Sequence, residues 1–401
     1  MPYRLYSRTL FAMLVIGMFL GPTLFGSAAG AFALIAGLAW SIECVVNEGI
    51  IHKTPTFILI WIAAALCFFP IYLINNDDIH NVVFGFNQFA FVLSFGVYHI
   101  AAKKLTYRHF DFVGIAGLLG LILCTVWCIV SYLFLGNNRV SAILGAGPNL
   151  LARTAIILYS FLSVYSIYKV KTGSALKIHV LALALTATVV SATGSKGSML
   201  VLPFPFFLFL ITYLIVHRSN FEAKKLAFAA IALVLFVLAV VVLEPNQVLL
   251  RGLMRIKSIF DGSDVDASTA IRIEMWKLSW SAFQEAPIFG TGWNSFGELA
   301  LNTKLHTYSI KIDRFDFHAD ILNFAVAAGL LGVLLYACFI FAPLASHFRG
   351  PQLPPHLRYM NYVFPITALA LGLTDSNISY DLPAMLYAFS FALIYGIEKQ
   401  N

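Results

Sequence analysis

The sequence predicts an all-α integral membrane protein with about 12 transmembrane helices. Hydrophobic residues make up 60% of the 401-residue chain and charged residues only 11%, and the mean hydropathy is +0.84. Soluble globular domains do not have this composition. The apolar residues also occur in runs of about 17–25, which is the length that a helix needs to cross the hydrocarbon core of a bilayer.

Each apolar run is predicted to form one transmembrane helix. The first follows Arg4 and Arg8, as the apolar part of a signal peptide would, but it continues into a second apolar run without a convincing cleavage site. We therefore expect it to be retained. The five cysteines lie inside apolar runs and lack metal-ligand spacing, which argues against a disulfide framework or a zinc site. The predicted spans cover residues 9–27, 29–47, 56–75, 82–101, 112–136, 149–168, 177–193, 197–216, 225–243, 319–345, 358–374 and 382–397.

The distribution of lysine and arginine predicts how the chain is oriented. If the N-terminus is cytoplasmic, most of the 26 basic residues fall in cytoplasmic loops. The short loops on the opposite side hold only Arg139, Lys196 and, at a helix start, Arg153. The positive-inside rule then places both termini in the cytoplasm. The net charge of +7 is spread over membrane loops and not over a soluble basic domain, so we expect no nucleic-acid partner.

The spans divide the chain into three parts that form one functional unit. Residues 1–243 hold the first nine spans, residues 244–317 form a large non-cytoplasmic loop with surface helices, and residues 318–401 hold the last three spans. Long loops are exempt from the charge rule, so the basic residues in 244–317 do not contradict the orientation. This loop is the natural place for a function beyond permeation.

A surface helix is predicted inside the loop. Capping residues at 266–269 precede an apolar-periodic segment that should end near Pro287 and Gly290. Arg272 then lies in the first turn and shares one face with other residues, which would let the helix lie at the membrane surface with Arg272 facing the bundle. An arginine that binds lipid headgroups is an equal alternative. The other residues of this predicted face are Met275, Trp276, Ser279 and Phe283.

His318 stands where the polar loop becomes an apolar span. A histidine at this boundary can take a proton from a hydroxyl near neutral pH, although it could also be bonded to a backbone carbonyl. Arg139, Lys196 and Asp375 lie on the same predicted side; their ordinary interpretations are a loop cation, a lysine at a helix end and a helix cap. With Arg272, these cations and the histidine fit a diphosphate on a polyprenyl carrier.

Two further features have structural interpretations. The glycine-rich segment 290–297 looks like a phosphate-binding loop, but it does not follow a strand and lacks the Walker lysine, so a turn is predicted. Glu43 is a costly carboxylate inside the second span and could be a proton-relay group. No cation is evident at matching depth, so we expect a helix–helix hydrogen bond.

Several segments resemble the O-antigen ligase and polymerase superfamily of bacterial membrane glycosyltransferases, and most resemble the ligase. His318 followed by Gly329 and Gly332 is similar to the histidine helix of that superfamily. Residues 271–276 with 287–292 are similar to its preceding loop motif. Three shorter segments match in the same order along the chain: 145–152, which contains Asn149; 193–197, which contains Lys196; and 372–375, which ends at Asp375.

The resemblance implies a GT-C-type helical bundle with a large periplasmic loop, and transfer of a glycan from undecaprenyl diphosphate without a metal or cofactor. It implies that Arg272 and Lys196 bind the diphosphate with help from Arg139. His318 would be the base for the acceptor, oriented by Asp375, and Asn149 would support the site. Two positions depart from the pattern. Lys196 stands where arginine is usual, which loses bidentate phosphate geometry, and Ala319 stands where asparagine is common.

The expected function is therefore that of an O-antigen ligase. Such an enzyme lies in the bacterial inner membrane, in contact with membrane lipids. Its site faces the periplasm and moves a preassembled polysaccharide from undecaprenyl diphosphate to the lipid A-core oligosaccharide. A polysaccharide polymerase of the same superfamily is the nearest alternative. A lipid-linked sugar transporter or flippase is more distant, because it would place charges near mid-bilayer and not at one face.

Overall fold

The computed structural model describes residues 2–48, 54–75, 88–137, 139–144, 147–172, 174–216, 267–293, 295–301, 316–349 and 353–400. All regular secondary structure within these ranges is helical, which confirms the all-α class. Six helical segments are long and apolar enough to cross a membrane: residues 27–46, 107–133, 148–168, 175–193, 196–216 and 320–346. The predicted span at 225–243 lies outside the described residues, and the total of about 12 spans stays a prediction.

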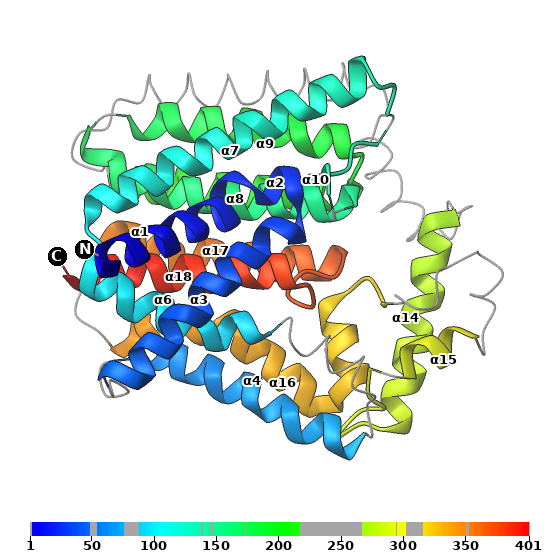
Figure 1. Ribbon diagram of the computed structural model, residues 1–401. Helices are drawn as coiled ribbons and strands as arrows, with labels where there is room; N and C mark the ends of the chain where they lie inside the picture. The colour runs from blue at the N-terminus through cyan, green and yellow to red at the C-terminus, as the bar shows by residue number, and fades with distance from the viewer. Residues whose placement is uncertain are drawn as a thin grey trace.

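The long helices lie side by side in one bundle, and both chain termini lie at the same end of it (Figure 1). The opposite end carries α14 and α15, and α14 runs across the bundle (Figure 1). The main helices are α1 (Pro2–Val15), α3 (Ser27–Glu48), α4 (Thr56–Ile74), α6 (Phe89–Lys104), α7 (Tyr107–Leu133), α8 (Pro148–Tyr168), α9 (Ala175–Thr193), α14 (Ala267–Glu285), α16 (Asp320–Arg349), α17 (Pro355–Thr374) and α18 (Asp381–Gln400); α15 spans Ser295–Leu301.

The centre of the bundle is formed by α8 and α18. Both helices are buried on every face, which requires that neighbouring helices cover them completely. Every residue of α8 from Leu150 to Ile167 is buried, and so is α18 from Leu382 to Ile397. The N-terminal turn of α8 and the segment that leads into α18 therefore have fixed positions, and both contribute to the candidate site.

The first predicted span is not one helix. After α1 the chain makes a π-helical turn over Ile16–Leu20 and then a short helix α2, Pro22–Phe25. Pro22 cannot donate a backbone hydrogen bond to the preceding turn, and a side chain at Gly17 would lie 2.6 Å from the backbone nitrogen of Ala33. The close packing of this segment on α3 accounts for the break.

The predicted span at 197–216 is also divided. It forms α10 (Lys196–Val201) and α11 (Pro203–Val216), and the break comes where Pro203 removes a backbone donor. Proline is common at the first position of a helix, as in α11. The two helices together keep the predicted membrane-crossing length, but they are not one continuous helix.

α16 contains a break that docks the loop following α14. Ala328 and Gly329 have non-helical backbone angles, and Gly329 has φ +61°. The freed backbone groups bond to the loop: Leu330 N–H donates to Pro287 O at 2.7 Å, and Thr291 N–H donates to Val326 O at 2.8 Å. A side chain at Gly329 would lie 2.4 Å from the Ile288 carbonyl carbon. Residues 287–292 thus fix α14 against α16, and the predicted turn at 290–297 is found only in its first part, because α15 begins at Ser295.

The structure supplies a partner for Glu43 that the sequence did not indicate. Lys104 Nζ, at the end of α6, lies 2.8 Å from Glu43 Oε1 on α3. The expected helix–helix hydrogen bond is therefore found, between α6 and α3, and its donor is a cation, so the contact is also an ion pair.

Candidate active site

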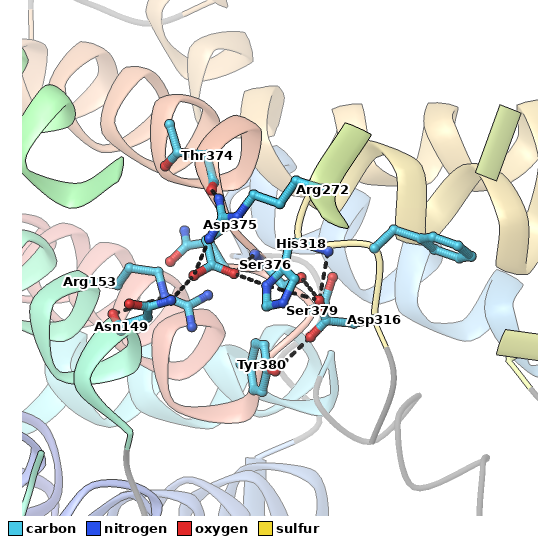
Figure 2. Close-up of polar contacts among 12 residues, drawn as sticks. Asn149, Arg153, Arg272, Asp316, His318, Thr374, Asp375, Ser376, Ser379 and Tyr380 are labelled. Carbon is cyan, nitrogen blue, oxygen red and sulfur yellow. Dashed lines mark hydrogen bonds and ion pairs between the residues drawn. The ribbon is translucent and has the colours of Figure 1, made fainter. Parts of the chain in front are cut away.

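His318 precedes α16 in a conformation that side chains rarely adopt. It has φ +50° and is the only non-glycine residue with positive φ in the described part of the chain. Its backbone N–H donates to Asp316 Oδ1 at 2.7 Å, which holds this turn. Strained backbone of this kind is concentrated at functional sites, where the surrounding structure enforces it. The turn aims the imidazole at the end of α17 (Figure 2).

The partner of the imidazole is a carboxylate. His318 Nδ1 lies 2.7 Å from Asp375 Oδ1, so the backbone-carbonyl partner considered for a boundary histidine is not found. Asp375 ends α17, and its Oδ1 also accepts the Ser376 N–H at 2.9 Å. The other oxygen, Oδ2, accepts from Asn149 Nδ2 at 2.9 Å. The two acceptor oxygens thereby fix the carboxylate relative to both the histidine and α8.

Asp316 is a second carboxylate beside the imidazole, and no role was predicted for it. Its Oδ1 lies 3.5 Å from His318 Nδ1 and accepts from Ser376 Oγ at 2.9 Å. Its Oδ2 accepts from the Tyr380 hydroxyl at 2.7 Å. Figure 2 shows this carboxylate and Asp375 on two sides of the imidazole. The histidine is therefore held between two negative groups.

The segment between α17 and α18 owes its shape to two buried residues of α16. Asp320 accepts backbone N–H bonds from Asn377 and Ile378 at 2.8 Å each, and the Ser379 hydroxyl at 2.7 Å. Asn323 Nδ2 donates to Ser376 Oγ at 2.9 Å, and its Oδ1 accepts the Phe317 N–H. These bonds tie the segment after Asp375 to the same helix that follows His318.

Arg272 reaches the site from α14. One guanidinium nitrogen, Nη1, donates to the Thr374 carbonyl, and Nη2 lies 3.9 Å from Asp375 Oδ2. The predicted orientation of this arginine toward the bundle is confirmed. The face of α14 is only partly as predicted, because Met275 and Ser279 are buried but Trp276 is 39% exposed.

Asp375 is linked to Arg139 through Asn149, which is hydrogen-bonded to both. Arg139 Nη2 donates to Asn149 Oδ1 at 3.0 Å, and its Nε donates to Thr193 O at 3.2 Å. Gly194, with φ +64°, gives the chain the turn that leaves room for Arg139 at the end of α9. A continuous series of side chains thus runs from Arg139 through Asn149 and Asp375 to His318.

Lys196 begins α10 at the same end of the bundle. A side chain at the next residue, Gly197, would lie 2.9 Å from Thr374 Cβ, so the backbone of α10 lies against the end of α17. The close approach at Gly197 is therefore made to another helix of the bundle. Gly145 and Ala146, which belong to the segment around Asn149, lie outside the described residues.

Arg153 belongs to the site, although from the sequence it was identified only as a basic residue at a helix start on the non-cytoplasmic side. Its Nε donates to Asn149 O at 3.2 Å, and its guanidinium carbon lies 5.1 Å from the centroid of the Tyr380 ring. It is only 4% exposed. The available signal was its spacing: it follows Asn149 by four residues, so both lie on one face of a predicted helix.

The surrounding charges set the protonation of the two central groups. Burial lowers the pKa of His318, but its hydrogen bond to Asp375 and the charges of Asp316 and Asp375 outweigh burial and the opposing charge of Arg272, so the pKa is raised. Burial raises the pKa of Asp375, but Arg153, His318 and Arg272 outweigh this effect and lower it. Asp375 is therefore ionised near neutral pH, and the basicity of His318 is increased.

This arrangement suits a proton acceptor. With Nδ1 held by Asp375, the other ring nitrogen, Nε2, has no partner among the described residues, and the side chain is 36% exposed. The donor atoms of Asp316, His318 and Asp375 lie within 4.8 Å of one another, a spacing that a metal ion could bridge. Arg272 and Arg153 place two positive groups beside Asp375, however, and these oppose a cation. The charges favour a carboxylate-oriented histidine beside a site for anions.

The comparisons with known proteins agree with the sequence motifs. The family model described as O-antigen ligase matches residues 181–337, a range that contains Lys196, Arg272 and His318. A search of curated proteins found no match to the chain. Together with the membrane-length helices, the family match indicates a multi-pass inner-membrane protein of the glycosyltransferase type. It confirms the resemblance of this chain to the O-antigen ligase superfamily.

Proposed function

We propose that this protein is an O-antigen ligase-like glycosyltransferase that moves a preassembled polysaccharide from undecaprenyl diphosphate to the lipid A-core oligosaccharide at the periplasmic face of the inner membrane. The observation that carries the proposal is the geometry around His318. Asp375 holds Nδ1 at 2.7 Å, which leaves Nε2 open to an acceptor, and an arginine lies beside the same carboxylate. The family match gives the class of reaction.

His318 acts as the general base in this proposal. With Nδ1–H donated to Asp375, Nε2 carries the lone pair and accepts the proton of the acceptor hydroxyl. The acceptor oxygen forms a bond to the anomeric carbon of the glycan as the bond from that carbon to the phosphate oxygen breaks. Undecaprenyl diphosphate leaves with the electron pair, and the proton resides on the imidazolium, which Asp375 and Asp316 stabilise.

The cations stabilise the leaving diphosphate. Arg272 is placed to bind it, because its guanidinium already lies between Thr374 and Asp375 at the mouth of the site. Lys196 begins a helix whose backbone lies against Thr374, and Arg139 lies at the outer end of the hydrogen-bond series. Positive groups and a helix N-terminus that converge on developing phosphate charge lower the barrier to departure. No metal ion is required in this scheme.

A polymerase of the same superfamily is the second candidate, and the family match is the observation that favours it, because both reactions use the same donor chemistry. The difference lies in the acceptor: a core sugar for a ligase, or another lipid-linked repeat for a polymerase. The segments 217–266 and 302–315 lie outside the described residues.

The test is a transfer assay with the purified protein in detergent, with chelator present. It offers an undecaprenyl diphosphate-linked glycan together with lipopolysaccharide that lacks O-antigen, and the products are separated on a gel. Glycan on the lipopolysaccharide supports the ligase. Extension of the glycan on the carrier lipid supports the polymerase instead. Transfer to neither acceptor, by a protein that retains its thermal stability, contradicts a glycosyltransferase.

A further inference from the structure

Arg153 is a buried cation whose role the reaction above does not explain. It lies in the first turns of α8 and is 4% exposed, and its Nη1 has no hydrogen-bond partner among the described residues. A buried guanidinium with an unpaired nitrogen is costly unless a nearby negative charge compensates for it. Its burial also means that a donor phosphate could reach it only after the side chains above it had moved.

Two contacts fix Arg153 beside the His318–Asp375 pair. Its Nε donates to Asn149 O, and the side chain of Asn149 donates to Asp375 Oδ2. Its guanidinium lies over the ring of Tyr380, whose hydroxyl donates to Asp316. Figure 2 shows Arg153 on the side of Asp375 away from His318. It therefore contacts the groups that hold both carboxylates, but it does not contact the imidazole.

We propose that Arg153 is a positioning residue that keeps Asp375 ionised and in place, and thereby sets how strongly His318 holds a proton. The consequence for catalysis rests on the proposed function, but the electrostatic role does not. Arg153 is the leading positive influence that lowers the pKa of Asp375. The unpaired Nη1 fits this role, because the charge acts over distance without a direct hydrogen bond.

The charges that face His318 come from several elements. Asp316 lies on its own segment, Asp375 and Tyr380 flank the segment between α17 and α18, and Arg272 reaches in from α14. Arg153 acts from α8 through Asp375. Because the imidazole and the carboxylate share a proton, they titrate as a pair. Removing Arg153 or Arg272 takes a positive charge away from the His318–Asp375 pair. The pair then holds its proton more tightly, so the pKa of His318 should rise.

The test measures this pKa directly. The histidines of the purified protein, ten in all, are labelled with ¹³C at Cε1 and titrated by NMR in detergent, and the spectrum of His318→Gln identifies the His318 signal. In Arg153→Met the pKa of His318 should rise by roughly half a unit or more. In Arg153→Lys, which keeps the charge, it should stay close to the wild-type value. Arg108→Met removes an exposed cation on α7 and should change nothing.

A His318 pKa that is unchanged in folded Arg153→Met overturns the proposal. If Arg153→Met does not fold, kinetics of Arg153→Lys decide. The proposal expects a lower kcat with the KM for the lipid-linked donor within about twofold of wild type, because lysine keeps the charge but loses the planar guanidinium. A KM raised tenfold at unchanged kcat would identify a phosphate ligand and overturn it. Absence of transfer by the wild-type protein would contradict the proposed function alone, because the NMR result does not depend on substrate.

Discussion

The described part of the chain contains two histidine–carboxylate pairs at opposite ends of the bundle, and only one of them is arranged for chemistry. The site pair is His318 with Asp375, at 2.7 Å. The terminal pair is His356 in the first turn of α17 with Glu398 near the end of α18, at 3.2 Å. Glu398 lies in the last turn of α18, and the C-terminus lies at the end of the bundle away from α14 (Figure 1).

The two pairs differ in access and in backbone. The His318 side chain is 36% exposed, and its backbone has φ +50°. The His356 side chain is 7% exposed, lies within a regular helix, and packs near the rings of Phe110 and Tyr168. Glu398 also accepts the Tyr107 hydroxyl, so this pair links α7, α17 and α18. The terminal pair is a structural contact between helices.

The comparison teaches that a histidine beside a carboxylate is not sufficient evidence of a catalytic base. What distinguishes the site pair is an open ring nitrogen, a second carboxylate at 3.5 Å, and guanidinium groups beside the first carboxylate. An open nitrogen can reach a substrate, and nearby cations can receive the charge that a leaving group develops.

The largest effect should come from removing the two imidazoles in turn. His318→Ala should lower transfer about 10²- to 10⁴-fold, the range that a general base contributes. His356→Ala should keep transfer within a few-fold and instead lower the apparent unfolding temperature, because it removes a buried helix contact. Transfer by both purified variants in the same gel assay checks this. Equal losses would mean that the site pair has no special role.

The orienting carboxylate should come next. Asp375→Asn keeps the shape but can present its amide N–H₂ to the imidazole, which would favour the wrong tautomer, so kcat should fall about 10²- to 10³-fold. The matched variant is Asp111→Asn, which weakens the ion pair with Lys169 and the Tyr165 contact at the other end of the bundle. Its kcat should stay near wild type. A near-normal kcat for Asp375→Asn would remove the carboxylate from the mechanism.

Loss of the Arg272 guanidinium on α14 should weaken binding of the lipid-linked donor. Arg272→Ala removes a charged donor, which is worth about 1.5–3 kcal/mol, so the KM for the lipid-linked donor should rise roughly 10- to 100-fold, and kcat should fall as well because the guanidinium also stabilises the leaving diphosphate. Lys277→Ala removes an exposed cation of the same helix that pairs with Glu274. Its KM should not change. If both variants raise KM alike, α14 contributes only a general positive field.

The last prediction concerns stability, with no direct effect expected on the chemistry, and compares two glycines with positive φ. Gly136 has open space around it, so Gly136→Ala should lose only about 1–2 kcal/mol for the backbone conformation. Gly329→Ala adds a clash with the backbone of Pro287 and Ile288 and should lose about 3 kcal/mol or more. Apparent unfolding temperatures in detergent check the order. Equal values would mean that the break in α16 does not hold the loop after α14.

Local pattern predicted much of the fold and the centre of the site. The apolar runs gave the bounds of several helices closely, as α4 (Thr56–Ile74) against the predicted 56–75 illustrates. His318, Arg272 and Asp375 were grouped by chemistry and predicted side, and the structure brings them together. Hydrophobic length and charge are properties of short segments, so one sequence is enough to recognise them.

What could not be predicted depends on contacts between distant segments. The break at Gly329 exists because a loop about 40 residues earlier docks there, and the apolar pattern of α16 does not reveal this contact. The partner of Glu43, Lys104, is supplied by another helix. Trp276 was predicted to lie on the same face as Arg272. Apolar side chains occur both on faces that pack against other helices and on faces that contact lipid, so apolar periodicity cannot tell these two kinds of face apart. Arg153 and Asp316 became part of the site only when Asn149, Tyr380 and Asp375 converged.

The central claim, that His318 is the base and Asp375 sets its basicity, is tested most directly by the pH dependence of single-turnover transfer. A base must be neutral to accept a proton, so activity should fall as pH drops through the pKa of His318, which the site raises above the ordinary value of 6.5. The predicted result is an acidic limb centred above pH 6.5 that moves to lower pH in Asp375→Asn. A rate without an acidic limb between pH 5 and 8, or a limb that Asp375→Asn leaves in place, would contradict the account.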